Sequence, residues 1–132
     1  MNRLVSRLLA LLLVVVVGLT GCSSAGSNLT GDYRQDTLDL VSSLREAIEL
    51  PEGTPEKMEA QAEAKTRIDN FFSLYRRDSS VASLPSFTTM HTALDALAGH
   101  YRSYGNRPLS NKLKTRLEQE FKQVEMAVQR GR

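Results

Sequence analysis

The sequence predicts an all-α protein, a single up-and-down four-helix bundle, on the basis of three observations. Four segments place apolar residues at alternating steps of three and four, which is the spacing of one helix face. Proline, glycine and serine separate these segments, and the connections are short. No segment alternates apolar and polar residues as a half-buried strand does. Four amphipathic helices bury their faces most simply in one shared core, with an irregular helical array as the alternative.

Residues 1–21 of the 132 are predicted to be a lipoprotein signal peptide and not part of the fold. Arg3 and Arg7 precede an apolar run over residues 8–17, which is too short for a membrane-spanning helix of about 20 residues. The small residues before Cys22 resemble a bacterial lipobox, which implies cleavage before Cys22 and lipid on its thiol and new amino group. An ordinary signal peptide with a chance cysteine is the alternative.

Residues 22–31 are predicted to form a lipid-anchored flexible tether, and residues 32–130 the bundle. Cys22 is the only cysteine, so no intramolecular disulfide is possible and stability depends on an apolar core. Removal of residues 1–21 leaves 15 basic and 15 acidic residues, and nucleic acid is not expected to bind an exported neutral domain. Residues 22–74 hold 5 basic and 10 acidic residues, and residues 75–132 hold 10 and 5. Such asymmetry can steer a partner unless the fold interleaves the two halves.

The first helix is predicted over residues 32–50 and the second from Thr54 to about Arg76. Thr54 is a favoured N-cap, and Pro55 costs nothing in a first helical turn. The first half of the second helix is rich in Ala, Glu and Gln and is expected to be solvated. The predicted apolar stripes are Tyr33, Thr37, Leu40, Val41, Leu44, Ala47 and Ile48 in the first helix, and Ala64, Ile68, Phe71, Phe72 and Tyr75 in the second.

Residues 77–85 are predicted to be a linker across the end of the bundle. The third helix is predicted to begin near Ser86 and to end at Gly105 in a left-handed C-cap. Ser110 is the predicted N-cap of the fourth. The apolar stripes are Phe87, Met90, Leu94, Leu97, Ala98, Tyr101 and Tyr104 in the third helix, and Leu113, Leu117, Phe121, Val124 and Val128 in the fourth.

The sequence contains no pattern typical of catalysis, so we expect neither an enzyme nor a cofactor. His91 and His100 fall roughly 180° apart around the third helix and cannot share one metal on it. There is no Glu-x-x-His pair, no glycine-rich phosphate loop and no Gly-x-Ser-x-Gly. The alternative is an exported helical lipoprotein that carries a metal, or a haem held by Met58 or Met90 with a histidine. A second alternative is a structural lipoprotein of the cell envelope.

The remaining signal is a set of polar residues at the two ends of the third helix. Arginine and tyrosine are enriched in binding hot spots because they combine apolar contact area with fixed hydrogen-bonding geometry. For the arginines, interaction with a helix dipole is the structural alternative. The candidate partner-binding residues are Arg76, Arg77, Asp78, Tyr104, Asn106 and Arg107.

Five segments resemble the lumenal photosystem II assembly and repair lipoproteins of cyanobacteria. They are YRRDSSV (75–81), SFTTM (86–90), LAGHY (97–101), YGNRP (104–108) and KLKxRLxxEF (112–121). With Gly31-Asp32-Tyr33 at the start of the first helix, the resemblance covers about residues 31–128, and the lipobox agrees with it.

This resemblance implies a monomeric four-helix bundle without a reaction of its own, anchored by lipid to the lumenal side of the thylakoid membrane. Such proteins bind photosystem II cores that lack a working oxygen-evolving cluster. They contact the large lumenal loop of the smaller core-antenna chlorophyll protein and keep extrinsic subunits off until the manganese cluster is assembled. The contact surface is expected at the matching residues Arg76, Arg77, Asp78, Asn106 and Arg107.

Overall fold

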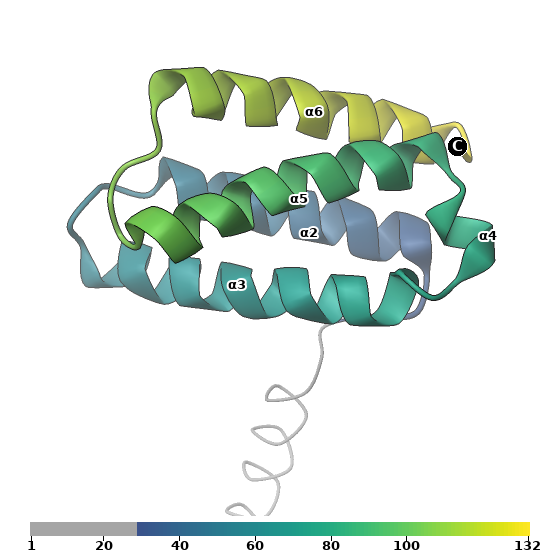
Figure 1. Ribbon diagram of the computed structural model, residues 1–132, viewed down its shortest axis with the longest axis horizontal. Helices are drawn as coiled ribbons and strands as arrows, with labels where there is room; N and C mark the ends of the chain where they lie inside the picture. The colour runs from purple at the N-terminus through teal and green to yellow at the C-terminus, as the bar shows by residue number, and fades with distance from the viewer. Residues whose placement is uncertain (1–28) are drawn as a thin grey trace, which may run out of the picture.

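The computed structural model describes residues 29–132. The predicted signal peptide, the lipid attachment at Cys22 and most of the predicted tether lie outside the described residues. The described helices are α2 (Tyr33–Glu49), α3 (Pro55–Tyr75), α4 (Ser79–Ala82), α5 (Pro85–Tyr104) and α6 (Asn111–Gln129), and this part of the chain contains no strand. The four long helices run alternately in opposite directions (Figure 1), which confirms the all-α, up-and-down four-helix bundle. None of the helices in residues 29–132 has the length and apolar character needed to cross a membrane.

The bundle has two layers. Helix α2 packs beside α3 and α6, and α5 packs beside α6 and α3, so α2 and α3 form one layer and α5 and α6 the other. Residues 50–54 and 105–110 form the connections at one end, which we call the loop end (Figure 1). Residues 76–84, with α4, and the C-terminus lie at the opposite end, which we call the α4 end. The two ends carry the candidate site residues.

The predicted apolar stripes of the four long helices meet in one core. Burial of a large apolar side chain contributes about 1.5–3 kcal/mol, so this core supplies most of the driving force for folding. Its members on the long helices are Leu40, Val41, Leu44, Ala47, Ala64, Ile68, Phe71, Tyr75, Phe87, Met90, Ala93, Leu94, Leu97, Tyr101, Leu117, Phe121, Val124 and Val128.

The first half of α3 is not wholly solvated, which corrects the prediction made from its composition. Lys57 and Gln61 are both 2% exposed. They stand seven and three residues before Ala64, so they continue the buried stripe of α3 towards the loop end. A lysine can occupy such a position because its long apolar stem packs while its ammonium group reaches a polar partner.

The predicted linker over residues 77–85 contains one helical turn, α4. Asp78 is its N-cap and accepts a hydrogen bond of 3.0 Å from the backbone N–H of Ser80. Val81 is buried at 6% exposure and fixes the turn against the core. A cap followed by one apolar contact therefore orders this segment, although four residues are too few to show a helical periodicity.

The predicted caps Thr54 and Ser110 are confirmed, and Asp32 caps α2 in the same way. Gly105 ends α5 with φ 58° and ψ −122°, so it has the predicted positive φ but not the left-handed helical conformation. These angles are those of the first central residue of a type II′ turn, where glycine is strongly favoured. The chain consequently reverses sharply here and presents residues 106–108 at the loop end.

Candidate partner-binding surface

The candidate partner-binding residues divide between the two ends of the bundle. Arg76, Arg77 and Asp78 follow α3 at the α4 end, whereas residues 104–107 follow α5 at the loop end. The 20 residues of α5 separate the two groups. At 1.5 Å per residue this corresponds to about 30 Å, so the two groups cannot form one small pocket.

At the α4 end, Arg76 and Arg77 are exposed, and neither makes an ion pair within residues 29–132. The Arg76 guanidinium lies 5.2 Å from the centre of the Phe72 ring, and that ring lies 5.1 Å from the His91 ring. This stacking holds the guanidinium against an apolar surface while its N–H groups stay available. A shallow hollow of about 460 Å³ is lined by Asp69, Phe72, Ser73, Arg76 and Arg77.

Asp78 is the N-cap of α4. Its Oδ1 accepts hydrogen bonds from the Ser80 hydroxyl at 2.6 Å and from the Ser80 backbone N–H at 3.0 Å. These hydrogen bonds, the side-chain one first, hold the pKa of Asp78 below its usual value. The carboxylate therefore orients the turn that follows the two arginines.

At the loop end, Tyr104 is 57% exposed, so its ring is a surface feature and does not continue the core stripe as predicted. It lies 5.3 Å from the His100 ring. The His100 Nε2 is 2.8 Å from the backbone carbonyl oxygen of Arg107, so α5 holds the turn that follows it. Asn106 and Arg107 are exposed on that turn. Tyr75, in contrast, is 3% exposed and belongs to the core.

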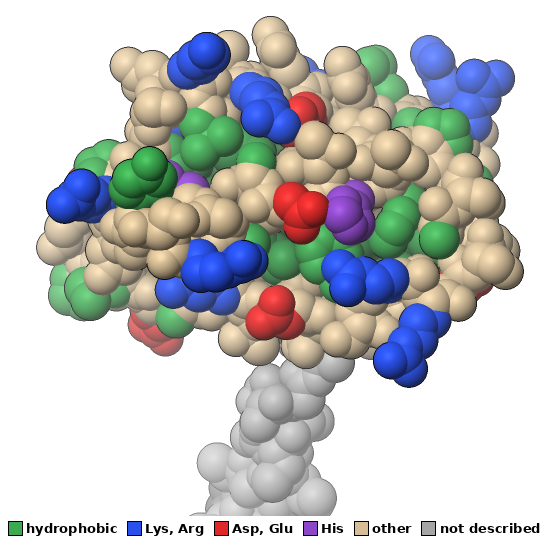
Figure 2. Space-filling view, in the orientation of Figure 1, with side chains coloured by type: hydrophobic (Ala, Val, Ile, Leu, Met, Phe, Trp, Pro, Cys, Tyr) green, Lys and Arg blue, Asp and Glu red, His purple; other side chains and the backbone are tan. Residues whose placement is uncertain are grey.

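Basic side chains are scattered over the face that joins the two ends. Figure 2 shows Lys and Arg spread over this face, where α5 lies in front, with fewer Asp and Glu among them. Several of the acidic groups after residue 75 are engaged within the protein: Arg45 pairs with Glu118 and Glu125, and Arg116 with Glu120. The cations that remain without an ion pair in residues 75–132 are Arg76, Arg77, Arg102, Arg107, Lys112, Lys114, Lys122, Arg130 and Arg132.

A buried polar cluster that was not predicted from the sequence is centred on Asp36, which is 2% exposed. Its carboxylate accepts hydrogen bonds from the Thr30 N–H and hydroxyl, both at 2.8 Å, and from the Gly31 N–H at 3.1 Å. The Tyr75 hydroxyl donates the fourth. An acidic residue within the apolar stripe between Tyr33 and Leu40 was the available signal, because a buried charge requires partners.

The cluster changes the acidity of its members. Burial acts to raise the pKa of Asp36, but the hydrogen bonds from Thr30, Tyr75 and Gly31 outweigh burial and hold that pKa below its usual value. Burial, and then the hydrogen bond to Asp36, raise the pKa of the Tyr75 hydroxyl well above its usual value. The Tyr33 hydroxyl lies 2.8 Å from the Ser86 Oγ and links α2 to α5. These contacts fix the α4 end of the bundle.

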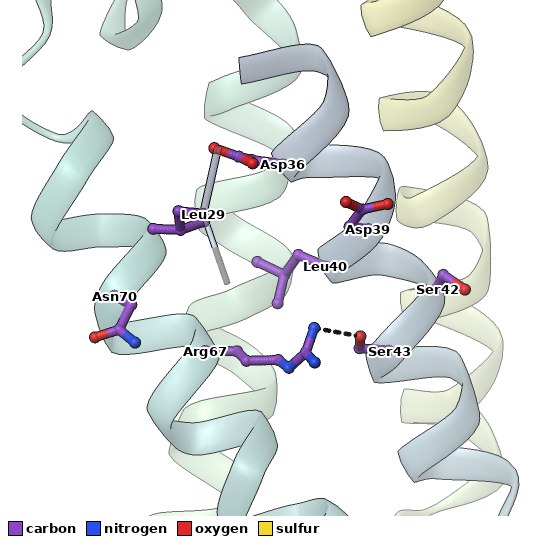
Figure 3. Close-up of a pocket in the computed structure, with 8 residues that line it drawn as sticks. All are labelled: Leu29, Asp36, Asp39, Leu40, Ser42, Ser43, Arg67 and Asn70. Atoms are coloured by element: carbon purple, nitrogen blue, oxygen red, sulfur yellow. Dashed lines mark hydrogen bonds between the residues drawn. The ribbon is translucent and has the colours of Figure 1, made fainter. Parts of the chain in front are cut away.

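A hollow of about 350 Å³ lies between α2 and α3 beside this cluster (Figure 3). Arg67 reaches across from α3, and its Nη1 donates to the Ser43 Oγ of α2 at 2.8 Å. Arg67 also pairs with Glu63 at 2.8 Å, and Asp39 accepts from Gln35 at 3.0 Å. Because these charged groups already have partners in the protein, the hollow offers little to a charged ligand.

The two histidines contact different groups. The His91 Nδ1 lies 3.2 Å from the Asp95 Oδ2, whereas His100 contacts the backbone of the turn after α5. Within residues 29–132, no group of three or more His, Cys, Asp or Glu side chains is arranged to hold a metal ion. Met90, a possible haem ligand in the sequence analysis, is fully buried in the core.

A family model described as Photosystem II Pbs27 matches residues 10–128. The chain is 59% identical over 130 residues to the photosystem II assembly factor lipoprotein Psb27 of Thermosynechococcus vestitus, covering 98% of this chain and 97% of that protein. It is 54% identical to the photosystem II lipoprotein Psb27 of Synechocystis, over 96% and 93% of the two chains. It is 30% identical to the chloroplastic photosystem II repair protein PSB27-H1 of Arabidopsis thaliana, over 76% of this chain and 59% of that protein.

Two solved structures have the same fold. The solution structure of Psb27 from cyanobacterial photosystem II superposes with a TM-score of 0.76 at 50% identity, covering 81% of this chain and 93% of that one. The crystal structure of PSB27 from Arabidopsis thaliana gives a TM-score of 0.74 at 30% identity, with 76% and 99% covered. The family match, the relatives and the four-helix bundle agree, and the chain belongs to the photosystem II Pbs27 family.

Proposed function

We propose that this protein is a non-enzymatic assembly and repair factor that binds photosystem II intermediates. The observation that carries the proposal is the 59% identity, over 98% of the chain, to a protein named as a photosystem II assembly factor lipoprotein. The relative from Arabidopsis thaliana is named as a repair protein, which supports the second half of the proposal. The protein has no catalytic role in this proposal, and it acts by occupying a surface.

The proposed partner surface is the lumenal loop of the smaller core-antenna chlorophyll protein. Occupation of that loop holds extrinsic subunits off until the manganese cluster is assembled. The exposed groups at the two ends of α5, about 30 Å apart, suit a large protein surface better than a small ligand. The protein acts as a monomer in this proposal, which agrees with the use of all four apolar stripes in its own core.

The proposed location is the lumenal side of the thylakoid membrane, with lipid on Cys22 as the anchor. Two relatives that match almost the whole chain are named as lipoproteins, and the lipobox before Cys22 supports the same modification here. Stable anchoring requires more than one acyl chain, since each buried CH₂ contributes about 0.8 kcal/mol.

Affinity capture of a tagged full chain from thylakoids, followed by crosslinking, tests the function. We expect recovery of photosystem II cores depleted of extrinsic subunits, with crosslinks from residues 76–78 and 104–107 to the lumenal loop. Recovery of fully active complexes, or of no photosystem II subunit, would contradict the proposal.

Paired substitutions at each end test the proposed contact residues separately. Truncation of a fully desolvated arginine in an interface costs roughly 2–4 kcal/mol of binding, whereas an arginine at the rim costs little. We therefore expect either Arg76→Ala with Arg77→Ala, or Asn106→Ala with Arg107→Ala, to weaken binding to isolated cores at least about tenfold. Arg34→Ala with Lys65→Ala, which removes two exposed cations of the α2–α3 layer outside these groups, is the matched control. Unchanged affinity in both test pairs would remove these residues as the contact surface.

A further inference from the structure

The chain enters the bundle through a short segment that is fixed to both helices of one layer. We call residues 29–31 the strap. The Thr30 N–H and hydroxyl and the Gly31 N–H all donate to the carboxylate of Asp36 on α2. The same buried carboxylate accepts the hydroxyl of Tyr75 on α3. Residues 29–31 were predicted to be part of a flexible tether, but the structure packs them against the bundle.

The strap leaves the bundle on the outside of the α2–α3 layer. Leu29 is half-buried against the core and lies between α2 and α3 (Figure 3). It helps to line the hollow beside Leu40 and Arg67, and also a neighbouring open hollow of about 550 Å³ with Ser73 and Leu74. The structure therefore fixes the side of the bundle from which the chain runs back towards Cys22.

The length of chain beyond the strap limits how the bundle can be oriented. Seven peptide units separate Cys22 from Leu29, which gives a reach of at most about 25 Å at 3.3–3.6 Å per residue. Two layers of helices are about 20 Å thick, since one helix with its side chains is about 10–12 Å wide. A path around the side of the bundle is longer than this thickness. A lipid at Cys22 can therefore lie next to the α2–α3 layer but has almost no reach beyond the α5–α6 layer.

The charge of the two layers is consistent with this geometry. Residues 29–75, which include α2 and α3, hold 5 basic and 10 acidic residues, and residues 85–132, which include α5 and α6, hold 8 and 4. Most charges of the two halves of the sequence thus fall in different layers, although Arg76 and Arg77 lie at the end of α3 and Arg45 of α2 bridges to Glu118 and Glu125 of α6. The basic layer is the one farther from the strap.

We propose that the α2–α3 layer is the face that the protein turns towards the lipid surface, and that the α5–α6 layer faces away from it. This inference rests on the lipid anchor proposed above. The covalent anchor and the strap hold the α2–α3 layer against the lipid surface. Attraction between cations and anionic lipids is not required. The cations of α5 and α6 are therefore left free for a protein partner.

A fluorescence quenching experiment on the lipidated full chain tests the orientation. Cys22 is the only cysteine and is blocked by lipid, so a second cysteine can be labelled selectively. Ser73→Cys places the label on exposed α3 beside the strap, and Gln123→Cys places it on exposed α6. In phosphatidylcholine vesicles with nitroxide-labelled headgroups, we expect quenching to be several-fold stronger at position 73 than at position 123.

The outcomes separate the anchor from the orientation. Flotation of the protein with the vesicles, combined with equal quenching or stronger quenching at position 123, would overturn the orientation and leave the anchor intact. Failure to float would overturn both. Addition of anionic phosphatidylglycerol is expected to leave the ratio unchanged, and a rise at position 123 would show adsorption through the basic layer instead.

Substitutions in the strap and in its partner Asp36 test whether the strap orients the bundle. Asp36→Asn and Thr30→Val weaken the strap, so we expect each to bring the quenching at positions 73 and 123 closer together. Thr30→Val leaves the core intact and keeps the test valid if Asp36→Asn fails to fold. Asp39→Asn is the matched control, because this exposed carboxylate on α2 accepts a hydrogen bond from Gln35 of the same helix. An unchanged ratio in Thr30→Val and a folded Asp36→Asn would remove the strap as the orienting element.

Discussion

Asp36 is a buried carboxylate that is stabilised by hydrogen-bond donors and not by a cation. Two donors come from Thr30, one from the Gly31 backbone and one from Tyr75, and no ion pair to Asp36 occurs in residues 29–132. A carboxylate that accepts several hydrogen bonds keeps its charge when buried, because each bond favours the ionised form. One side chain thereby joins α2, α3 and the strap.

The hydrogen bonds to Asp36 predict how stability depends on pH. The pKa of Asp36 is lower in the folded protein than in the unfolded chain, so its contribution is complete above about pH 4 and is lost as the pH falls through the folded value. We expect Asp36→Asn to lower the free energy of unfolding at neutral pH by roughly 1.5–3 kcal/mol and to weaken the loss of stability in acid. Urea unfolding between about pH 3 and pH 7 measures both effects. An equally steep loss in the variant would show that other groups control acid unfolding.

Tyr75 and Tyr33 provide a matched pair of hydroxyl deletions within one aromatic cluster. Their rings lie 5.3 Å apart, but the Tyr75 hydroxyl donates to the charged Asp36, whereas the Tyr33 hydroxyl meets the neutral Ser86. Hydrogen bonds to charged groups contribute roughly 1.5–3 kcal/mol and neutral ones about 1 kcal/mol. We expect Tyr75→Phe to lower the free energy of unfolding more than Tyr33→Phe, as measured in urea at neutral pH. A larger loss in Tyr33→Phe than in Tyr75→Phe would mean that the remaining donors to Asp36 compensate fully for the lost Tyr75 hydroxyl.

At the scale of the helix, the C-terminal end of α2 depends on a residue of α3. The Lys57 ammonium group donates to the backbone carbonyls of Ile48 at 2.7 Å and Leu50 at 3.1 Å, and it lies 3.1 Å from the Glu52 carboxylate. The last carbonyls of a helix have no partner within it, and a cation there also interacts favourably with the helix dipole. A buried lysine thus joins two helices that are adjacent in sequence.

Loss of this ammonium group should destabilise the loop end. Lys57→Met keeps the apolar stem but leaves two carbonyls without their donor, so we expect the free energy of unfolding to fall by roughly 2–3 kcal/mol. Lys65→Met is the control on the same helix, because Lys65 is exposed and only lies over the Tyr101 ring, a contact worth about 0.5–1 kcal/mol. Thermal or urea unfolding of both variants makes the comparison. Equal losses would contradict the capping role of Lys57.

The helices were predictable because their signals are local. The caps Thr54 and Ser110, Pro55 in a first turn and the apolar stripes each act within a few residues of sequence. The buried positions of Lys57 and Asp36 were not predictable, because the groups that compensate their charge belong to other segments of the chain. Helix α4 was missed because its order depends on a cap and one tertiary contact.

For the whole molecule, the sequence identified exposed polar residues at the ends of α5 but not how the charges are distributed over the fold. The separation of the two groups follows from the length of one helix, so it was predictable. Whether the acidic and basic halves cancel depends on which helices share a layer, and that is set by packing. The use of Asp78 as the N-cap of α4 likewise depends on how the chain folds after α3.

The separation of charge between the layers predicts the kinetics of partner binding. Because steering acts through the field of the whole protein, we expect association with photosystem II cores to slow roughly tenfold or more between low and high salt. Lys122→Glu on α6 and Lys65→Glu on α3 change the net charge equally at exposed positions of different layers. If the partner approaches the α5–α6 layer, Lys122→Glu slows association more than Lys65→Glu, while both dissociation rates stay nearly unchanged. Binding of each variant to surface-immobilised cores, repeated over a series of salt concentrations, measures the association and dissociation rates. A larger effect of Lys65→Glu would place the approach on the α2–α3 layer, and the absence of any salt dependence would exclude steering by the basic layer.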